Sequence, residues 1–349
     1  MYTCSDSTQD ANVNNFRWFV YDQFGLSFRN VKAIELENFG NHSQLVLTSL
    51  NDPVRTPGQL LVRVLAAGVN FIDIYQRSGV PSYRKPLPFT PGLEGVGEVL
   101  EHDEVSRFRK GDIVAWPFWP GSYAELISID QAKVVLVPTG VDPEVAVAGM
   151  LQGLTAHYLV TDTYQVTGQT SAIVLAASGG VGLLLVQMIK KLGGRVIGVS
   201  STAAKVKMVK DFGADEAITY EEFSDRVAAN SLKVDVVFDS VGNATYLQSL
   251  KSLKPRGLLA LFGASSGPVP AFDLQLLNSH GSLFVTRPNL ADYMATQAEL
   301  ESRATAVFDQ ILSGDLQISI HKTYPLADAG QAHLDLESRG TSGKLILIP

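Results

Sequence analysis

The chain has 349 residues, of which 46% are hydrophobic and 18% charged, and its formal net charge at pH 7 is −7. This length predicts two domains, and the acidic balance argues against a broad nucleic-acid-binding or membrane-binding surface. No apolar run is long enough to span a bilayer, and no Lys/Arg tract marks a local basic patch. We therefore expect neither a membrane nor a nucleic acid as a partner.

The single cysteine, Cys4, limits both disulfide chemistry and metal binding. One cysteine cannot form an intramolecular disulfide, and it cannot supply a four-cysteine zinc lobe. A reducing interior suits such a chain, and we expect a cytoplasmic location. Residues 1–30 are polar and acidic, which is typical of a variable extension, although import into an organelle stays open as an alternative.

The segment from residue 31 to about residue 151 has an all-β pattern with frequent turn residues. Strands are predicted at residues 60–65, 95–100 and 112–116. Four prolines between positions 81 and 91 predict one long connecting loop. We therefore expect a β-rich domain that begins near residue 31.

Strands and helices alternate after Gln152. The expected strands are 172–176, 195–199, 216–220, 234–238 and 257–262, and the expected helices between the first three are 181–192 and 203–212. This alternation predicts a parallel, doubly wound sheet. A helix near 295–312 and a final strand at 345–348 follow, and we expect the final strand to return to the β-rich domain.

The strongest local signal is Ala-Ala-Ser-Gly-Gly-Val-Gly at residues 176–182, between a predicted strand and a predicted helix. Glycines allow a tight turn here and let the backbone approach a pyrophosphate, which the helix N-terminus then binds. Ala177 takes the first glycine position of the usual motif, so in isolation a purely structural turn is an equal alternative. The alternating context favours a dinucleotide site that includes Gly179, Gly180, Val181 and Gly182.

The second strand of this unit distinguishes between the two nicotinamide cofactors. NAD-selective sites place an Asp or Glu about 20 residues beyond the turn, where it binds the ribose 2′-hydroxyl. Residues 199–205 contain no carboxylate, whereas Ser200, Ser201 and Lys205 suit a 2′-phosphate. Lys205 alone could be an ordinary solvated lysine, and Tyr220, at the end of the third strand, could add a hydroxyl. The sequence therefore favours NADPH.

Several motifs occur in a fixed order along the chain, at residues 67–73, 91–97, 111–114, 121–125 and 176–182. Together they resemble the medium-chain dehydrogenase/reductase superfamily, and within it the NADPH:quinone oxidoreductase, or zeta-crystallin-like, family. The sequence Val-Thr-Arg-Pro at 285–288 and residues 336–339 strengthen the similarity to the bacterial-type enzymes. The resemblance covers essentially everything after residue 30.

The resemblance implies an α/β fold with two domains. A GroES-like β domain would comprise residues 31–153 and 290–349, and a Rossmann domain with a doubly wound parallel sheet would comprise residues 154–289. Residues 1–30 would be an N-terminal extension. In this family a strand near residues 282–286 pairs with its twin across a two-fold axis, so a homodimer is expected, with a simple edge strand as the alternative.

Zinc-dependent members of the superfamily have a cysteine where Asn70 stands and a histidine where Leu93 stands. Neither side chain here can supply a thiolate or an imidazole, and the six histidines are scattered without ligand spacing. We therefore expect no metal site. Without a Lewis acid, alcohol dehydrogenation is disfavoured, and an already activated acceptor such as a quinone or a conjugated carbonyl fits better.

The resemblance also implies roles for individual residues. Asn70 and Asp73 would lie at the active-site floor, where Asn70 could bond the ribose or the carboxamide, with a loop-capping asparagine as the alternative. Tyr75 and Tyr83 would form an aromatic wall of the substrate cleft, unless they are ordinary packing residues. The remaining matches to cofactor-contacting positions are Thr155, Gly180, Val181, Ser201, Lys205, Tyr220, Ser240, Phe262, Gly263, Val285, Arg287 and Arg339. No residue is indicated as an obligatory general acid.

The leading prediction is a zinc-independent NADPH:quinone oxidoreductase that transfers hydride to quinones. One alternative is an NADPH-dependent reductase of the double bond of enals, enones or 2-enoyl thioesters on the same scaffold. Another is an NADPH-regulated, RNA-binding crystallin-like protein, against which the acidic charge and the missing basic patch argue. A zinc alcohol dehydrogenase would need ligands that this sequence lacks.

Overall fold

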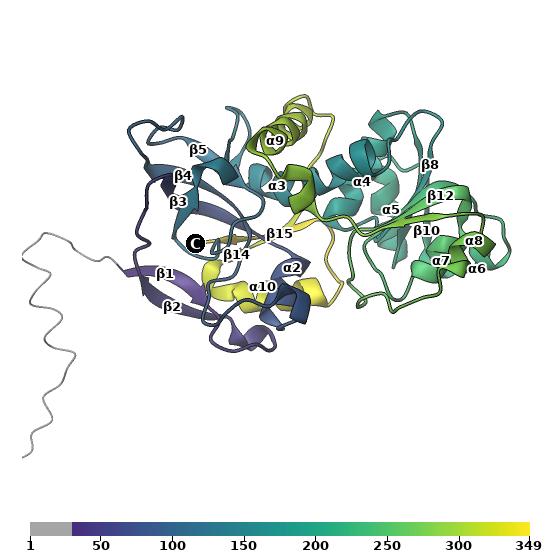
Figure 1. Ribbon diagram of the computed structural model, residues 1–349, viewed down its shortest axis with the longest axis horizontal. Helices are drawn as coiled ribbons and strands as arrows, with labels where there is room; N and C mark the ends of the chain where they lie inside the picture. Colours follow the sequence, from purple (N-terminus) through teal and green to yellow (C-terminus); the bar gives the residue numbers. More distant parts are fainter. Residues whose placement is uncertain (1–29) are drawn as a thin grey trace, which may run out of the picture.

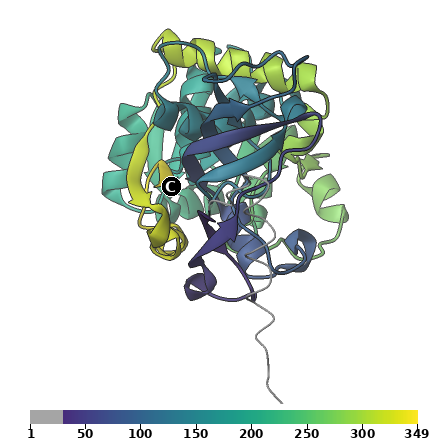
Figure 2. The ribbon, with the colours of Figure 1, turned by 90° about the vertical axis from the view of Figure 1, so that its left-hand side faces the viewer.

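The computed structural model describes residues 30–349, which contain a two-stranded, a six-stranded and a seven-stranded sheet. The seven-stranded sheet occupies the left half of Figure 1 and the six-stranded sheet the right half. Figure 2 shows the purple N-terminal strands beneath the blue strands of the larger sheet. The expectations for residues 1–29, including organelle import, lie outside the described residues. No helix of residues 30–349 is long and apolar enough to cross a membrane.

The seven-stranded sheet is built around β3, which pairs antiparallel with three neighbours, β4, β6 and β15. Its strands are β3 (Gln59–Val69), β4 (Glu94–Glu101), β5 (Ile113–Trp116), β6 (Leu126–Asp130), β7 (Val135–Leu136), β14 (Ile320–Pro325) and β15 (Lys344–Ile348). Leu60, Val62 and Val64 are buried at every second position of β3, as one face of a strand requires. Because β15 pairs with β3, the predicted return of the final strand is confirmed.

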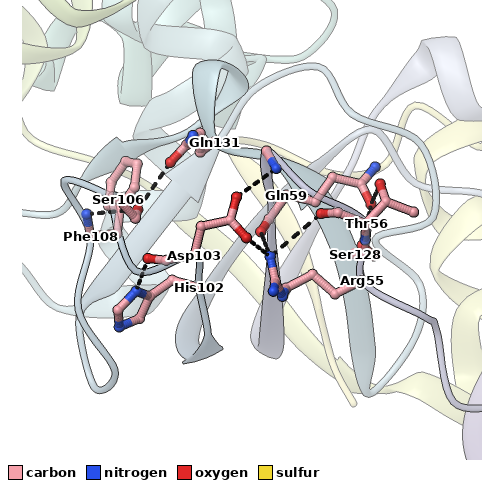
Figure 3. Close-up of polar contacts among 10 residues, drawn as sticks. Arg55, Thr56, Gln59, His102, Asp103, Ser106, Phe108, Ser128 and Gln131 are labelled. Carbon is pink, nitrogen blue, oxygen red and sulfur yellow. Dashed lines mark hydrogen bonds and ion pairs between the residues drawn. The ribbon is translucent and has the colours of Figure 1, made fainter.

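A polar cluster surrounds the start of β3 (Figure 3). Asp103 forms an ion pair with Arg55 and accepts a hydrogen bond from the backbone N–H of Gly58 at 2.7 Å. The Gln59 side-chain oxygen accepts from the Thr56 hydroxyl at 2.8 Å. The Gly58 N–H and the Arg55 guanidinium lower the pKa of Asp103. These contacts fix the loop that precedes β3.

The prediction that residues 31–151 are entirely β is wrong at two helices. The helix α2 (Phe71–Arg77) follows β3, and α3 (Pro143–Tyr158) begins well before Gln152. Asp142 caps α3 by accepting from the Glu144 N–H at 2.8 Å, and Pro143 occupies the first turn. This start signal is present in the sequence, but α3 is buried on most sides among small apolar residues. It therefore lacks the one-sided periodicity by which helices are recognised.

The six-stranded sheet is entirely parallel, in the order β10-β9-β8-β11-β12-β13. Its strands are β8 (Ser171–Leu175), β9 (Arg195–Ser200), β10 (Glu216–Thr219), β11 (Val234–Asp239), β12 (Leu253–Leu261) and β13 (Phe284–Thr286). The helices between them are α4 (Gly180–Lys191), α5 (Ala203–Asp211), α6 (Tyr220–Ala228), α7 (Tyr246–Lys251) and α8 (Gln275–Ser279). The predicted α/β fold class, with a doubly wound parallel sheet beside a β-rich unit, is confirmed.

The strand order reverses at β8, whose neighbours β9 and β11 lie on opposite sides. In such sheets ligands bind beyond the carboxyl ends of the strands at this switch point. Tyr220 was expected to end the third strand, but it begins α6, because Thr219 and Glu222 form a capping box there. Tyr220 still lies at the carboxyl end of β10, because α6 begins directly after this strand.

The two sheets are joined by helices rather than by an extended linker. The predicted boundary at residues 153 and 154 falls inside α3, which packs against α4 and against α9 (Gln297–Leu312). The chain then passes through β14 and α10 (Ala329–Glu337) to β15. The exact domain limits stay a prediction, but the continuity of α3 means that the two units share one buried core.

Candidate active site

A cleft of about 1070 Å³ is lined by residues of both units. The predicted site residues that line it are Asn70, Tyr75, Tyr83, Thr155, Gly179, Gly180, Val181, Gly182, Ser200, Ser201, Lys205, Tyr220, Ser240, Phe262, Gly263, Arg287 and Arg339. Asp73 and Val285 do not line it. The structure thus brings together side chains from positions 70 to 339, as a shared site requires.

The charged residues of the cleft lining are all cations. They are Arg84, Lys85, Lys205, Arg287 and Arg339, and no Asp or Glu of residues 30–349 lines the cleft. The chain as a whole carries a formal charge of −7, so the cleft has the opposite sign to the protein around it. A concave site with this charge concentrates anionic ligands.

The turn between β8 and α4 presents its backbone to the cleft. Gly179 donates its N–H to the Ala176 carbonyl at 2.9 Å, and Ala176 itself has a positive φ of 49°. A Cβ at Gly182 would lie 2.5 Å from the Ala176 oxygen, and a Cβ at Gly180 would collide with the side chain of Gln152. Only glycine fits at position 182, where the added atom would meet backbone atoms, whereas at position 180 it would displace the flexible end of the Gln152 side chain. The N-terminus of α4 is left open to a phosphate.

Lys205, at the start of α5, contacts the segment between α10 and β15 across the cleft. Lys205 donates from Nζ to the carbonyls of Arg339 at 2.6 Å and Thr341 at 2.8 Å. Burial lowers the pKa of Lys205. The Tyr220 oxygen accepts from the Ala176 N–H at 2.9 Å. Lys205 therefore connects the two units beside the hydroxyls of Ser200 and Ser201.

Asn70 lies at the floor of the cleft, and two residues that were not predicted as site residues, Glu94 and Lys344, are buried directly beneath it. The three lie at adjacent ends of β3, β4 and β15. Lys344 forms an ion pair with Glu94 and donates to the Asn70 side-chain oxygen at 2.8 Å. Glu94 and Lys344 are 0% and 1% exposed. Glu94 belongs to the motif at residues 91–97, and Lys344 is the first residue of an otherwise apolar terminal strand, but neither feature indicated that the two residues pair.

Asp73 lies one layer behind the floor and belongs to a buried polar chain. Its carboxylate accepts from the Asn70 N–H at 2.9 Å and from the Tyr123 hydroxyl at 3.1 Å. The Tyr123 hydroxyl also lies 3.1 Å from Nε2 of His333. Burial raises the pKa of Asp73 to about 7 and lowers the pKa of His333 to about 3. This placement gives Asp73 a supporting position rather than one in the cleft wall.

Phe71, Tyr75 and Tyr83 all line the cleft and lie close together, and their role as an aromatic wall for the substrate stays a prediction. The rings of Tyr75 and Tyr83 are 5.2 Å apart between centroids, and those of Phe71 and Tyr75 are 6.3 Å apart. Burial is the main cause that raises the pKa of Tyr75, so its hydroxyl is protonated at neutral pH.

The fold and the cleft define a dinucleotide-dependent oxidoreductase with a Rossmann unit and a GroES-like unit. Residues 56–169 match the family model of the alcohol dehydrogenase GroES-like domain, and residues 180–299 match that of the zinc-binding dehydrogenase. A quinone oxidoreductase of Pseudomonas aeruginosa is 41% identical over 325 residues, which cover 91% of this chain and 99% of that protein. The chain belongs to the quinone oxidoreductase family of medium-chain dehydrogenases/reductases, as predicted.

Two further relatives inform the site. The crystal structure of Escherichia coli quinone oxidoreductase complexed with NADPH is 37% identical, superposes with a TM-score of 0.87, and matches 91% of this chain and 100% of that one. A 2-haloacrylate reductase of a Burkholderia species is 36% identical, over 84% of this chain and 91% of that protein. The relatives thus include proteins named as quinone oxidoreductases and one named as a 2-haloacrylate reductase.

Proposed function

We propose that this protein is a zinc-independent NADPH:quinone oxidoreductase. The observation that carries the proposal is the cleft beside the glycine turn, whose charged lining residues are all cations. NADPH carries a pyrophosphate and a 2′-phosphate, and the family membership points to a quinone as acceptor. The proposal predicts tighter binding of NADPH than of NADH, measured by fluorescence titration of the purified protein. Equal affinity for the two would contradict it.

The residues present fit NADPH at both of its phosphate groups. The backbone at Gly179–Gly182 would hold the pyrophosphate, and Ser201 and Lys205 would hold the 2′-phosphate. When bound, the nicotinamide supplies a hydride to the acceptor. The chain itself contributes orientation, through Asn70 and Thr155 in the cleft lining, and exclusion of water by its two facing units.

The aromatic wall supports a planar acceptor. Tyr75 and Tyr83 present adjacent rings to the cleft, and aromatic faces bind flat conjugated molecules by stacking. A quinone is already electrophilic, so its reduction needs no Lewis acid. The protein's task at this end is to place the acceptor against the cofactor.

Zinc independence is part of the proposal and is supported by the side chains at the cleft floor. Both polar atoms of the Asn70 amide are already bonded within the protein, and Leu93 has no ligand atom. No group of three or more His, Cys, Asp or Glu side chains in the described chain is arranged to hold a metal ion. Activity that survives dialysis against a chelator would agree with this, and stoichiometric zinc lost together with activity would contradict it.

A second candidate is reduction of an activated carbon–carbon double bond, and the 2-haloacrylate reductase relative favours it. The same cleft could accept a conjugated acid, because its cations suit a carboxylate. Product analysis separates the two: a quinone yields its hydroquinone, whereas an enone yields the saturated carbonyl compound.

We further propose that the protein is a homodimer joined through β13. This strand is at the edge of the six-stranded sheet, and Phe284 is 61% exposed on it. An unpaired edge of this kind accepts a second strand. A monomeric mass by sedimentation equilibrium would contradict the proposal, and Phe284→Lys is expected to shift a dimer toward monomer. The cytoplasmic location stays a prediction.

A further inference from the structure

The amide of Asn70 has a fixed orientation that its neighbours determine. Lys344 can only donate, so the atom of Asn70 that lies 2.8 Å from its Nζ must be the amide oxygen. The Asn70 Nδ2 group then donates to the Glu94 carboxylate at 2.9 Å and to the Gly68 carbonyl at 3.3 Å. Both amide hydrogens are used, and one lone pair of the oxygen is left.

The ion pair that imposes this orientation cannot easily rearrange. The second Glu94 oxygen accepts from the Leu151 N–H at 2.5 Å, which fixes the carboxylate from its other side. A Cβ at Gly68 would lie 2.8 Å from the Lys344 Cε atom and would collide with the Glu94 carboxylate. Glu94 and Lys344 therefore have no spare room to move away from Asn70, which lines the cleft.

Stability alone gives no reason for the buried ion pair as a whole. Lys344 is 1% exposed at the start of a strand whose other residues are apolar, and replacing both members of a buried ion pair by apolar side chains of similar size is often neutral or stabilising, although removal of Lys344 alone would leave the Glu94 charge unpaired. What an apolar residue could not do is hold the Asn70 oxygen. This difference points to a role in the site.

We propose that Lys344 is a positioning residue that, with Glu94, turns the Asn70 amide so that it can accept but not donate a hydrogen bond in the cleft. The inference rests on the proposed function, because the donor it assigns lies on the nicotinamide end of NADPH: the amide N–H of the carboxamide or a ribose hydroxyl. It also means that Asn70 does not donate to the acceptor's carbonyl oxygen.

The test uses two variants and two ligands. Lys344→Met removes the donor that holds the Asn70 oxygen. The double change Glu94→Gln with Lys344→Met also removes the buried charge that would otherwise be left alone. In the Glu94→Gln variant the Leu151 N–H would still bond the side-chain oxygen at position 94, so the new amide nitrogen would face Asn70. A donor at this place favours the Asn70 amide turned over, with its oxygen where its nitrogen now lies. The matched control is Lys254→Met, which breaks the Lys254–Asp235 ion pair at the opposite end of the six-stranded sheet.

Dissociation constants are measured by calorimetry for NADPH and for adenosine 2′,5′-bisphosphate, which lacks the nicotinamide end. Loss of one hydrogen bond and exposure of its unpaired donor should weaken NADPH about tenfold or more in both Lys344 variants. Binding of adenosine 2′,5′-bisphosphate should stay within about twofold of wild type. Lys254→Met should change neither ligand's affinity.

Three outcomes decide the matter. Equal weakening of both ligands would show general damage and overturn the positioning role, as would unchanged NADPH binding in the folded double variant. Failure of the wild-type protein to bind either ligand would instead overturn the proposed function. The 3-acetylpyridine analogue of NADPH identifies the donor, because it lacks the carboxamide N–H. If Lys344→Met no longer weakens binding of this analogue, the carboxamide is the partner of Asn70; if the weakening persists, the ribose hydroxyl is.

Discussion

Gly68→Ala is expected to be among the more damaging small changes in this protein. The added methyl group would occupy the space of the Glu94 carboxylate and would lie 2.8 Å from Lys344 Cε. Overpacking of a rigid core costs about 1–3 kcal/mol, and parting a buried ion pair costs about 3–5 kcal/mol. Glu94 is bonded on both sides and cannot give way. We therefore expect a loss of about 3 kcal/mol or more in the free energy of unfolding.

The assay is thermal unfolding followed by calorimetry, with Gly168→Ala as the matched control. Gly168 is exposed, has no positive φ, and has only a backbone oxygen at 4.0 Å near the added Cβ. A loss of this size should lower the melting temperature by about 4 °C or more, while the control should be neutral or slightly stabilising. A Gly68→Ala protein as stable as the control would refute the argument that this site has no spare room.

The other predictions concern cofactor choice, pH dependence and the aromatic wall. Lys205→Ala should weaken NADPH about tenfold or more and NADH far less, because only NADPH has the 2′-phosphate; equal effects would remove that role, and the exposed Lys207→Ala is the control. Burial raises the pKa of Asp73 from 3.8 to about 7. Between these two pH values the carboxyl group is protonated in the folded protein and ionised in the unfolded chain, so the free energy of unfolding of the wild type falls as the pH rises. Asp73→Asn cannot ionise and should gain about 2 kcal/mol relative to wild type between about pH 5 and pH 8, measured by urea unfolding; a pH-independent difference would contradict this. Tyr75→Leu should raise KM about fivefold for a large planar quinone and less for 1,4-benzoquinone, and equal changes for both would argue against stacking.

Much of the fold followed from local patterns in the sequence. The strands of the parallel sheet are continuous apolar runs separated by helices, and this pattern survives in the structure from β8 to β12. The pattern failed at α3, because a helix buried on most sides has no polar face to create periodicity. Residues near the glycine turn were predictable because the phosphate chemistry restricts them to specific positions.

The buried pair beneath the floor of the cleft, Glu94 and Lys344, could not be predicted in the same way. Glu94 and Lys344 are separated by 250 positions, and they meet only because β4 and β15 both lie beside β3. A charged residue before an apolar strand does not reveal its partner. Asp73 was predicted at the site from its motif, but it does not line the cleft. Its position on α2 directs its carboxylate toward the Tyr123 hydroxyl behind the floor.

The most direct test of the central claim is steady-state oxidation of NADPH by the purified protein, without oxygen, with product analysis. The acceptors are 1,4-benzoquinone, 9,10-phenanthrenequinone and an enone. The account predicts stoichiometric hydroquinone from the quinones, faster with NADPH than with NADH, and unchanged after chelator treatment. Turnover of the enone alone, or no turnover despite tight NADPH binding, would contradict it.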